Sequence, residues 1–333
     1  MRAVWYERQG PAADVLIVGE TDTPNAGAGE VRVKLAASGV NPSDCNRRRG
    51  AGYRLEYPRV IPNSDGAGVV DQIGDGGPRE WLGRRVWLYN GQRGRAFGTA
   101  AEYIALDAGL VTPLADSVSF EAGATLGIPC MTAHRCVFRD GAVQGHTLLV
   151  TGGAGAVGHY AIQLAKWGGA QVITTVSSET KADHARAAGA DCVVNYRMED
   201  VAGRVMSFTK GQGVDRIVDV DFAANLETTL KVLKVNGVLA VYASTSNRAP
   251  VVPFSDMMRR NVTLQAFVLS TLPLEARRQA QQDITRWLET GRRMHPIAGR
   301  FPLEHTARAH EAVEAGTKLG TVVVLCQPGA RLH

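Results

Sequence analysis

The chain has 333 residues, of which 45% are hydrophobic and 21% are charged, and its formal net charge is +5. This length favours two domains over one, and no apolar run reaches the roughly 18–20 residues of a membrane helix. The basic residues are spread along the chain without a long basic tail, so nucleic acid is not expected as a main partner. The first ten residues lack the apolar stretch of a signal peptide, and we expect a cytoplasmic protein that does not associate with a membrane.

The cysteine pattern is typical of a protein from a reducing compartment. The sequence contains no C-x-x-C pair and no disulfide-like framework, so we expect free thiols at Cys45, Cys130, Cys136, Cys192 and Cys326. Cys130 and His134 could share one face of a helix, but a zinc site takes three or four ligands and no others lie nearby. Packing roles are favoured for both residues.

The first hundred residues predict short strands separated by glycine turns. The stretch EVRVKLAASGV at 30–40 alternates apolar and polar residues, as a half-buried strand does. Similar short strands are predicted at 66–74, 84–90 and 100–106. This part of the chain is therefore expected to be β-rich and irregular.

The pattern changes near residue 120, where SFEAGATLGIPCMTAHRCVF (119–138) places apolar residues at helical spacing. From there to about residue 268, apolar strands alternate with amphipathic helices, which predicts a parallel sheet covered on both faces. Six strands are the number of a complete dinucleotide-binding sheet, whose order is 3-2-1-4-5-6. They are predicted at 147–151, 171–176, 192–196, 215–220, 237–243 and 262–269.

The last part of the chain predicts two helices, at 274–291 and 304–316, and a final strand at 321–326. These elements form no obvious extension of the six-stranded sheet. They are candidates to complete the first domain.

A glycine-rich turn follows the first strand of the predicted sheet. It contains a G-x-G-x-x-G motif with a strand before it and a helix after it, the context that a dinucleotide site requires. The first glycine permits the sharp turn, the second lets the backbone approach phosphate, and the third lets helix and strand pack closely; packing alone is the alternative. We expect the pyrophosphate at the start of the helix, against Gly152, Gly153, Gly155, Ala156, Val157 and Gly158.

The end of the next strand indicates which dinucleotide binds. An NAD site usually places Asp or Glu there to bind the ribose 2′-hydroxyl, whereas this strand ends at Val176 and continues with Ser177 and Ser178. Two hydroxyl groups and the cation of Lys181 suit a 2′-phosphate. Glu179 could instead reach a ribose, but an acid also suits the first turn of the following helix. The sequence therefore favours NADP(H) over NAD(H).

Several stretches, in order, resemble the medium-chain dehydrogenase/reductase superfamily and, within it, the zinc-independent quinone oxidoreductases similar to zeta-crystallin. The resemblance covers nearly the whole chain. Its stretches are SGVNPSD at 38–44, GAGVV at 66–70, AGATLGIPCMTAHRCVF at 122–138, the glycine turn, GADCVVNYRMED at 189–200 and AHEAVEAGTKLGTVVV at 309–324.

This resemblance implies an α/β fold with two domains. A Rossmann-type doubly wound parallel sheet domain, residues 123–269, would be inserted into a GroES-like, partly open β-barrel catalytic domain formed by residues 1–122 plus 270–333. The active site would lie in the cleft between the domains. The resemblance also implies a homodimer that pairs the sixth strands of two Rossmann sheets, which would cover an apolar edge.

Zinc alcohol dehydrogenases share this fold, so the resemblance allows a test for their metal. Asn41 stands where their catalytic zinc has a Cys ligand, and Ser64 and Asp65 stand where it has a His–Glu pair. Residues 85–110, where the four-Cys structural site would lie, contain no Cys. Without thiolate or imidazole ligands in register, we expect no metal.

Hydride transfer without a metal suits an electron-poor substrate, because a quinone or enone needs positioning and hydrogen-bond donors more than a strong acid. The expected reaction is therefore the NADPH-dependent reduction of a quinone. The candidate catalytic residues are Asn41, as an amide donor, Tyr53, on a loop over the cleft, and Thr132, which resembles the family's nicotinamide-side threonine. Their alternative roles are a turn residue before Pro42, surface packing and an ordinary helix threonine.

The resemblance implies further cofactor contacts. Lys181 and Tyr196 resemble the family's 2′-phosphate ligands, although Lys181 could be a solvated helix lysine. Lys318, near the last strand, could close over the cofactor or be a surface lysine. The fifth and sixth strands end at the carboxyl edge of the sheet, where ligands bind, and their candidates are Tyr242, Ala243, Ser244, Phe267, Val268 and Leu269.

Two departures from the zeta-crystallin branch leave the substrate open. Asn46 stands where a tyrosine is common, beside the arginines at 47–49, and Asn63 stands where many relatives carry glycine. These residues could favour a polar or anionic substrate over a small quinone. The remaining alternatives are an enone or enoyl-thioester reductase and a non-catalytic NADPH-binding protein, either crystallin-like or redox-sensing.

Overall fold

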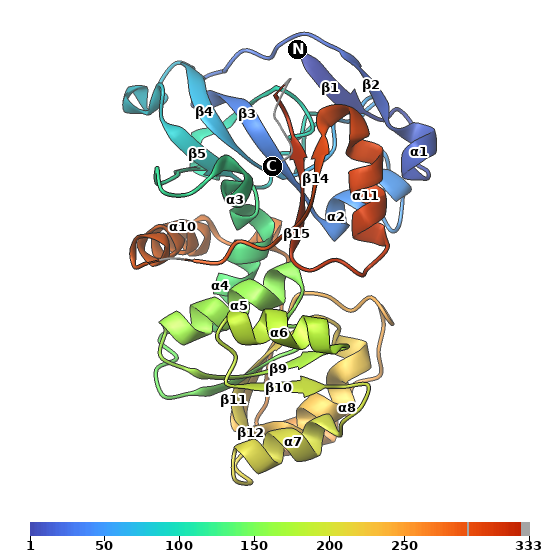
Figure 1. Ribbon diagram of the computed structural model, residues 1–333, viewed down its shortest axis with the longest axis vertical. Coiled ribbons are helices and arrows are strands. Elements are labelled where there is room, and N and C mark those ends of the chain that lie inside the picture. The colour runs from blue at the N-terminus through green and yellow to red at the C-terminus, as the bar shows by residue number, and fades with distance from the viewer. Residues whose placement is uncertain (292, 328–333) are drawn as a thin grey trace. The chain divides into compact units, whose positions relative to one another are not determined.

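The computed structural model describes residues 1–291 and 293–327, and the chain divides into two compact units. The first unit holds residues 1–128 and 281–333, and the second holds residues 129–280. In chain order, the second unit interrupts the first, so that blue and red segments combine in one unit of Figure 1. The boundaries lie six and eleven residues beyond the predicted ones at 122 and 269.

The sheet of the first unit is built from strands with alternating burial. In β3 (Glu30–Val40), Val31, Val33 and Leu35 are fully buried, while the residues between them reach the surface. The final strand of the chain, β15 (Thr321–Leu325), pairs antiparallel with β3, so the tail completes this unit. The sheet runs in the order β14 (Ile297–Pro302), β15, β3, β4 (Asp65–Ile73), β5 (Arg85–Leu88) and β7 (Val111–Pro113), and β6 (Tyr103–Asp107) also pairs with β3.

Helix α2 (Pro42–Arg49) has clear sequence signals at both ends. Pro42 occupies the first helical position, where a missing N–H costs nothing. Gly50 follows the helix with a φ of 81°, a left-handed conformation that favours glycine. Helix α11 (Thr306–Glu314) packs beside α2 (Figure 1). This unit also contains α1 (Ala12–Val15), α3 (Phe120–Gly123) and an antiparallel pair of β1 (Arg2–Trp5) with β2 (Ile17–Glu20).

The second unit contains the predicted parallel sheet. Its apolar core includes Leu149, Ile173, Ile217 and Leu239, one from each of four neighbouring strands. The strand order confirms the 3-2-1-4-5-6 order expected from the sequence. It runs β10 (Cys192–Asn195), β9 (Gln171–Val176), β8 (Thr147–Val150), β11 (Val214–Asp219), β12 (Leu233–Val241) and β13 (Thr263–Ala266).

Helices cover both faces of this sheet. Helices α5 (Ala156–Trp167) and α6 (Glu179–Ala187) lie on one face, and α7 (Val201–Phe208) and α8 (Phe222–Val232) lie on the other (Figure 1). Helix α4 (Met131–Phe138) packs against α5, α9 (Phe254–Arg259) precedes β13, and α10 (Leu274–Glu289) runs across the unit boundary at residue 280. None of the helices in the described part of the chain is long and apolar enough to cross a membrane.

The apolar stretch at 119–138 is not one regular helix. It contains α3, then a π-helical turn at Leu126–Cys130, and then α4. Gly127 has a non-helical ψ of −111°, and Pro129 lies inside the turn and has no N–H to donate. Helical spacing of apolar residues therefore identified the burial of this stretch but not its interruption.

Candidate active site

A buried polar group of four residues lies where α2 and β4 begin; we call it the Asn41 cluster, and it consists of Asn41, Asp44, Ser64 and Asp65. Asn41 Nδ2 donates to Asp65 Oδ2 at 2.7 Å, and the Asn41 backbone N–H donates to Asp44 Oδ2 at 2.9 Å. Ser64 Oγ donates to Asp44 Oδ1 at 2.9 Å. Asn41, Ser64 and Asp65, which the family resemblance sets at the zinc-ligand positions of alcohol dehydrogenases, therefore belong to one hydrogen-bond network.

Asp65 is a buried carboxyl group held by neutral donors. Its Oδ2 also accepts from the Ile128 backbone N–H at 2.9 Å, whereas Oδ1 has no hydrogen-bond partner among the described residues. Burial raises the pKa of Asp65 well above its ordinary value of 3.8, and the opposing effect of the Asn41 hydrogen bond is smaller. A Cβ on Gly127 would lie 2.2 Å from Asp65 Oδ1, so this carboxyl requires glycine in the interrupted helix.

The donor set of the Asn41 cluster is a poor match to zinc. Zinc in proteins takes thiolate, imidazole or carboxylate ligands, whereas Asn41 and Ser64 offer an amide and a hydroxyl. The Asp65 oxygen nearest Asn41 already accepts two hydrogen bonds. Within residues 1–291 and 293–327, no group of three or more His, Cys, Asp and Glu side chains could hold a metal ion.

The other candidate catalytic residues, Tyr53 and Thr132, and the candidate cofactor contact Lys318 lie in both units. Tyr53 is on the loop after α2, with 41% of its surface exposed, and Lys318 is half-buried and donates from Nζ to the Gly320 carbonyl at 2.6 Å. Burial lowers the pKa of Lys318. Thr132 is buried in α4 of the second unit, whereas Asn41, Tyr53 and Lys318 belong to the first. Contact of all these residues with one substrate and cofactor stays a prediction.

The glycine turn of the second unit has the geometry of a phosphate site. Gly152 has a φ of 68°, and Gly155 precedes α5 without a side-chain cap among the described residues. A Cβ on Gly153 would lie 2.1 Å from Thr174 Oγ1, and one on Gly158 would lie 2.4 Å from the Gly152 carbonyl oxygen. No side chain among the described residues caps the first N–H groups of α5, at Ala156 and Val157, and a phosphate bound there stays a prediction.

The end of β9 gathers hydroxyl groups and a cation. Lys181 Nζ donates to Ser177 Oγ at 3.0 Å, and Ser178 begins α6 by accepting from the Lys181 backbone N–H at 3.4 Å. The Tyr196 backbone N–H donates to the Val176 carbonyl at 3.0 Å, which places this half-exposed tyrosine beside the same strand end. Glu179, in the first turn of α6, forms an ion pair with Arg186 at 2.7 Å. The structure therefore brings Ser177, Ser178 and Lys181 together.

The remaining cofactor candidates follow β12 and β13. Tyr242 and Ala243 bond through the backbone to Asp219 and Phe222, and Ser244 Oγ accepts from the Ala223 N–H at 3.3 Å. The Phe267 N–H donates to Val241 at 3.4 Å. The structure thus places these candidates at the carboxyl edge of the sheet, where Val268 is exposed and Leu269 is buried.

The sequence analysis missed a polar group at the end of β11. Asp219 Oδ1 accepts from Thr151 Oγ1 at 2.8 Å and from Asn225 Nδ2 at 2.7 Å. Thr151 Oγ1 in turn accepts from the Val220 N–H at 2.9 Å. These bonds join the start of the glycine turn to the neighbouring strand end. The available signal was an acidic residue at the end of an otherwise apolar strand.

Comparisons with known proteins cover nearly the whole chain. The family described as "Alcohol dehydrogenase GroES-like domain" matches residues 27–116, and the family described as "Zinc-binding dehydrogenase" matches residues 156–289. The curated quinone oxidoreductase of Mus musculus is 29% identical over 330 residues, which are 98% of each chain.

Two solved structures extend this similarity to the fold. One is titled an NAD-dependent alcohol dehydrogenase, with 30% identity and a TM-score of 0.87, and the other is a mycobacterial protein complexed with NADPH, with 30% identity and a TM-score of 0.86. Each match covers 98% of this chain and 100% of the other. This chain is therefore an oxidoreductase that belongs to the medium-chain dehydrogenase/reductase superfamily, in its quinone oxidoreductase family.

Proposed function

We propose that this chain reduces a quinone with NADPH and needs no zinc ion. The observation that carries the proposal is the hydrogen bond between Asn41 and Asp65. It occupies the positions at which zinc alcohol dehydrogenases hold their metal, with groups that suit hydrogen bonding better than zinc coordination. A substrate reduced without a Lewis acid must already be electron-poor, as quinones and alkenones are.

The carboxyl edge of the second unit fits NADP(H). The uncapped start of α5 would hold the pyrophosphate, because its N–H groups and the helix dipole favour an anion. Lys181, Ser177 and Ser178, with Tyr196 beside them, would hold the 2′-phosphate. The two solved relatives differ in the nucleotide that their titles name, so the groups at the end of β9 decide our choice.

The reaction would use this chain mainly to bind and orient. Bound NADPH supplies a hydride. The Asn41 amide has a second N–H besides the one on Asp65, and it would donate to the substrate oxygen, where negative charge grows. Burial raises the pKa of Asp65, so the surroundings of this oxygen disfavour a negative charge on the carboxyl group. Tyr53 and Thr132 would supply hydroxyl groups, and the residues after β12 and β13, with Lys318, would border the cofactor.

We also propose that the chain forms a homodimer through β13. This strand is an edge of the parallel sheet, and apolar side chains are exposed on it and beside it: Phe254, Met258, Leu264 and Val268. An exposed apolar edge strand readily pairs with a second chain. The supporting observation is thus a sheet edge that a second copy would cover.

A substrate panel tests the proposed activity. We expect NADPH absorbance to fall when purified protein meets 9,10-phenanthrenequinone or 1,4-naphthoquinone, and a simple alcohol with NADP⁺ to give no reaction. Reduction of alkenones but not of quinones would instead identify the protein as an enone reductase. NADPH binding without oxidation across the whole panel would contradict an enzyme and favour a binding protein.

A further inference from the structure

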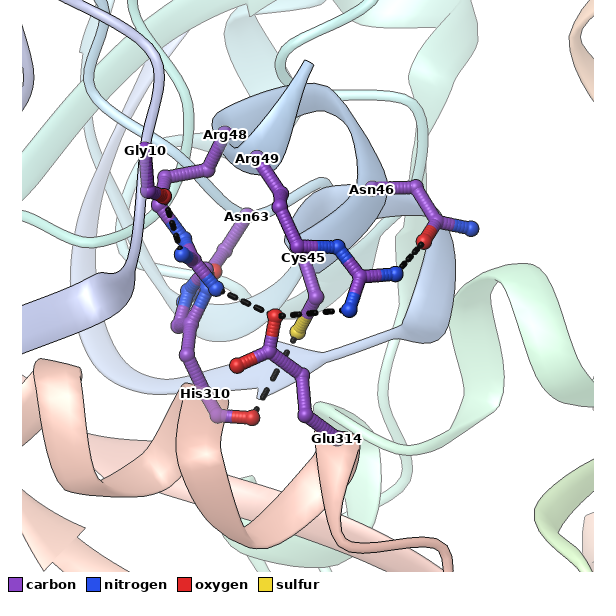
Figure 2. Close-up of polar contacts among 8 residues, drawn as sticks. All are labelled: Gly10, Cys45, Asn46, Arg48, Arg49, Asn63, His310 and Glu314. Atoms are coloured by element: carbon purple, nitrogen blue, oxygen red, sulfur yellow. Dashed lines mark hydrogen bonds and ion pairs between the residues drawn. The ribbon is translucent and has the colours of Figure 1, made fainter. Parts of the chain in front are cut away.

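The three consecutive arginines of α2 have different surroundings. The Arg48 side chain is fully buried, with its guanidinium 2.5 Å from Glu314 Oε1 and donating to the Gly10 carbonyl (Figure 2). Arg49 lies 3.8 Å from the same carboxylate and donates to Asn46 Oδ1 at 3.1 Å. Arg47 has no carboxylate oxygen within 4 Å among the described residues. Two of the three charges are therefore used inside the fold, and one is not.

Arg47 is held in place by neutral acceptors. Its Nη1 donates to Gln92 Oε1 at 2.8 Å and lies 3.4 Å from Ser64 Oγ. Both oxygens of the neighbouring Asp44 carboxyl already accept hydrogen bonds, from Ser64 and from the Asn41 N–H. A guanidinium has five N–H donors, and those on Nε and Nη2 have no acceptor within the described part of the chain. They form the edge that binds a carboxylate in a bidentate manner.

The Arg47 guanidinium lies over the ring of Tyr53, and Gln9 bonds to the backbone of both residues. The central carbon of the guanidinium lies 5.7 Å from the centroid of the Tyr53 ring, within the range of a cation–π contact. Gln9 Nε2 donates to the backbone carbonyls of Arg47, at 2.8 Å, and Tyr53, at 3.1 Å. Gln9 thus links the backbones of the two residues whose side chains form this contact.

A small cavity opens beside Arg47. Its volume is about 40 Å³, whereas one water molecule needs roughly 10–15 Å³. The cavity therefore has room for a group the size of a carboxylate rather than for an aromatic ring. Its lining contains three arginines and one glutamate, so the pocket is basic. The lining includes Arg47, Arg54, Arg93, Gln92, Tyr53 and Glu56.

We propose that this Arg47 pocket binds a carboxylate carried by the substrate, so that the enzyme favours electron-poor ketones or quinones that bear an acid group. The inference rests on the proposed function, because it needs the substrate oxygen to lie at Asn41. Ser64 links the two places: it accepts from Arg47 and is followed in the chain by Asp65, which holds Asn41. The pocket therefore sets substrate specificity, while Asn41 contacts the reacting carbonyl.

The test compares an acid with its methyl ester. With NADPH, 4-oxo-2-pentenoate and methyl 4-oxo-2-pentenoate share the same reducible alkene and ketone and differ in charge. We expect a higher kcat/KM for the acid, and we expect Arg47→Gln to lower the acid-to-ester ratio about 10- to 100-fold, the range for a lost charge-assisted hydrogen bond. Arg47→Lys should keep part of the preference. Arg49 is the matched control, because it is a neighbouring arginine that pairs with Glu314, and Arg49→Gln should leave the acid-to-ester ratio unchanged.

A binding measurement separates this inference from the proposed function. Titration calorimetry on the NADP⁺-loaded protein compares 4-oxopentanoate with its methyl ester, neither of which has an alkene to reduce. Tighter binding of the acid, lost in Arg47→Gln and kept in Arg49→Gln, supports the pocket even if no quinone or alkenone is turned over. Equal binding of acid and ester by the wild type, or a preference that survives Arg47→Gln, overturns it even if quinones are reduced.

Discussion

At the residue scale, the most informative feature is the buried carboxyl of Asp65. The pairing of Gly39 with Asp65 across β3 and β4 brings Asn41 against this carboxyl, although the two lie 24 residues apart in the chain. A buried carboxylate without a cationic partner is costly, and the structure answers with neutral donors from Asn41 and Ile128. Asp65 therefore positions the Asn41 amide through a hydrogen bond at a place where burial disfavours charge.

The stability of the protein should depend on pH through Asp65. Because burial raises the pKa of Asp65 above 3.8, the folded protein keeps this proton to higher pH than the unfolded chain does. The free energy of unfolding therefore falls as pH rises from about 4 toward the folded pKa, by at most about 1.4 kcal/mol per pH unit. Asp65→Asn cannot ionise and escapes this loss, so its stability relative to wild type should rise with pH.

Urea unfolding of both proteins between about pH 5 and pH 8 measures this difference. A difference that stays flat, or that falls as pH rises, would contradict a buried Asp65 that resists ionisation.

We expect the choice of nucleotide to depend on Lys181. Lys181→Ala removes the cation beside Ser177, and we expect the affinity for NADPH to fall about 10- to 100-fold while the affinity for NADH changes little. Fluorescence titration with both nucleotides checks this. Arg186→Ala, on the same helix but paired with Glu179 and Asp183, is the matched control and should keep the preference. Equal affinity of the wild type for both nucleotides would refute the 2′-phosphate site.

At the element scale, the glycine turn shows what a motif can and cannot predict. The strand, the turn and α5 follow directly from residue type and spacing, and the structure places them as expected. The interruption at 126–130 coincides with Gly127 and Pro129, which are visible in the sequence. What the sequence does not show is that Asp65, distant in the chain, fills the space of a side chain at Gly127.

The glycines of the turn should separate folding from binding. Gly158→Ala would place a Cβ 2.4 Å from the Gly152 carbonyl oxygen and force α5 away from β8. We therefore expect the free energy of unfolding to fall by roughly 1–3 kcal/mol and NADPH binding to be lost as well. At Gly155 the nearest atom to a Cβ lies at 3.3 Å, so Gly155→Ala should keep most of the stability and weaken NADPH binding. Urea unfolding and nucleotide titration measure the two effects. Unchanged NADPH binding in Gly155→Ala would argue against a phosphate at this turn.

At the scale of the whole molecule, two interleaved segments build the first unit and one continuous segment builds the second. The order of the parallel sheet could be expected from the sequence, because alternation of strands and helices leaves few topologies. The return of the tail to the first unit is what the family resemblance implies, and the structure adds that its last strand pairs with β3. The different bonding partners of the arginines at 47–49 could not be predicted from the sequence, because Glu314 and Gln92 are distant from them in the chain. Long-range side-chain pairing is the part of the site that only the structure reveals.

The proposed dimer makes a prediction at this scale. Leu264→Lys places a charge on the exposed edge of β13, and we expect it to convert a dimer into a monomer. Light scattering during size-exclusion chromatography measures the mass. Val235→Lys, at another exposed apolar position of the same unit, should stay dimeric. A wild-type protein that elutes as a monomer would contradict the proposed dimer.

The central claim is metal-free hydride transfer from NADPH to an electron-poor substrate. Its most direct test is the kcat/KM for 9,10-phenanthrenequinone with NADPH, measured before and after dialysis of the protein against a zinc chelator. The Asn41 cluster predicts the same value in both samples and no increase when zinc is added back. Activity that is lost on chelation and restored by zinc would contradict the account.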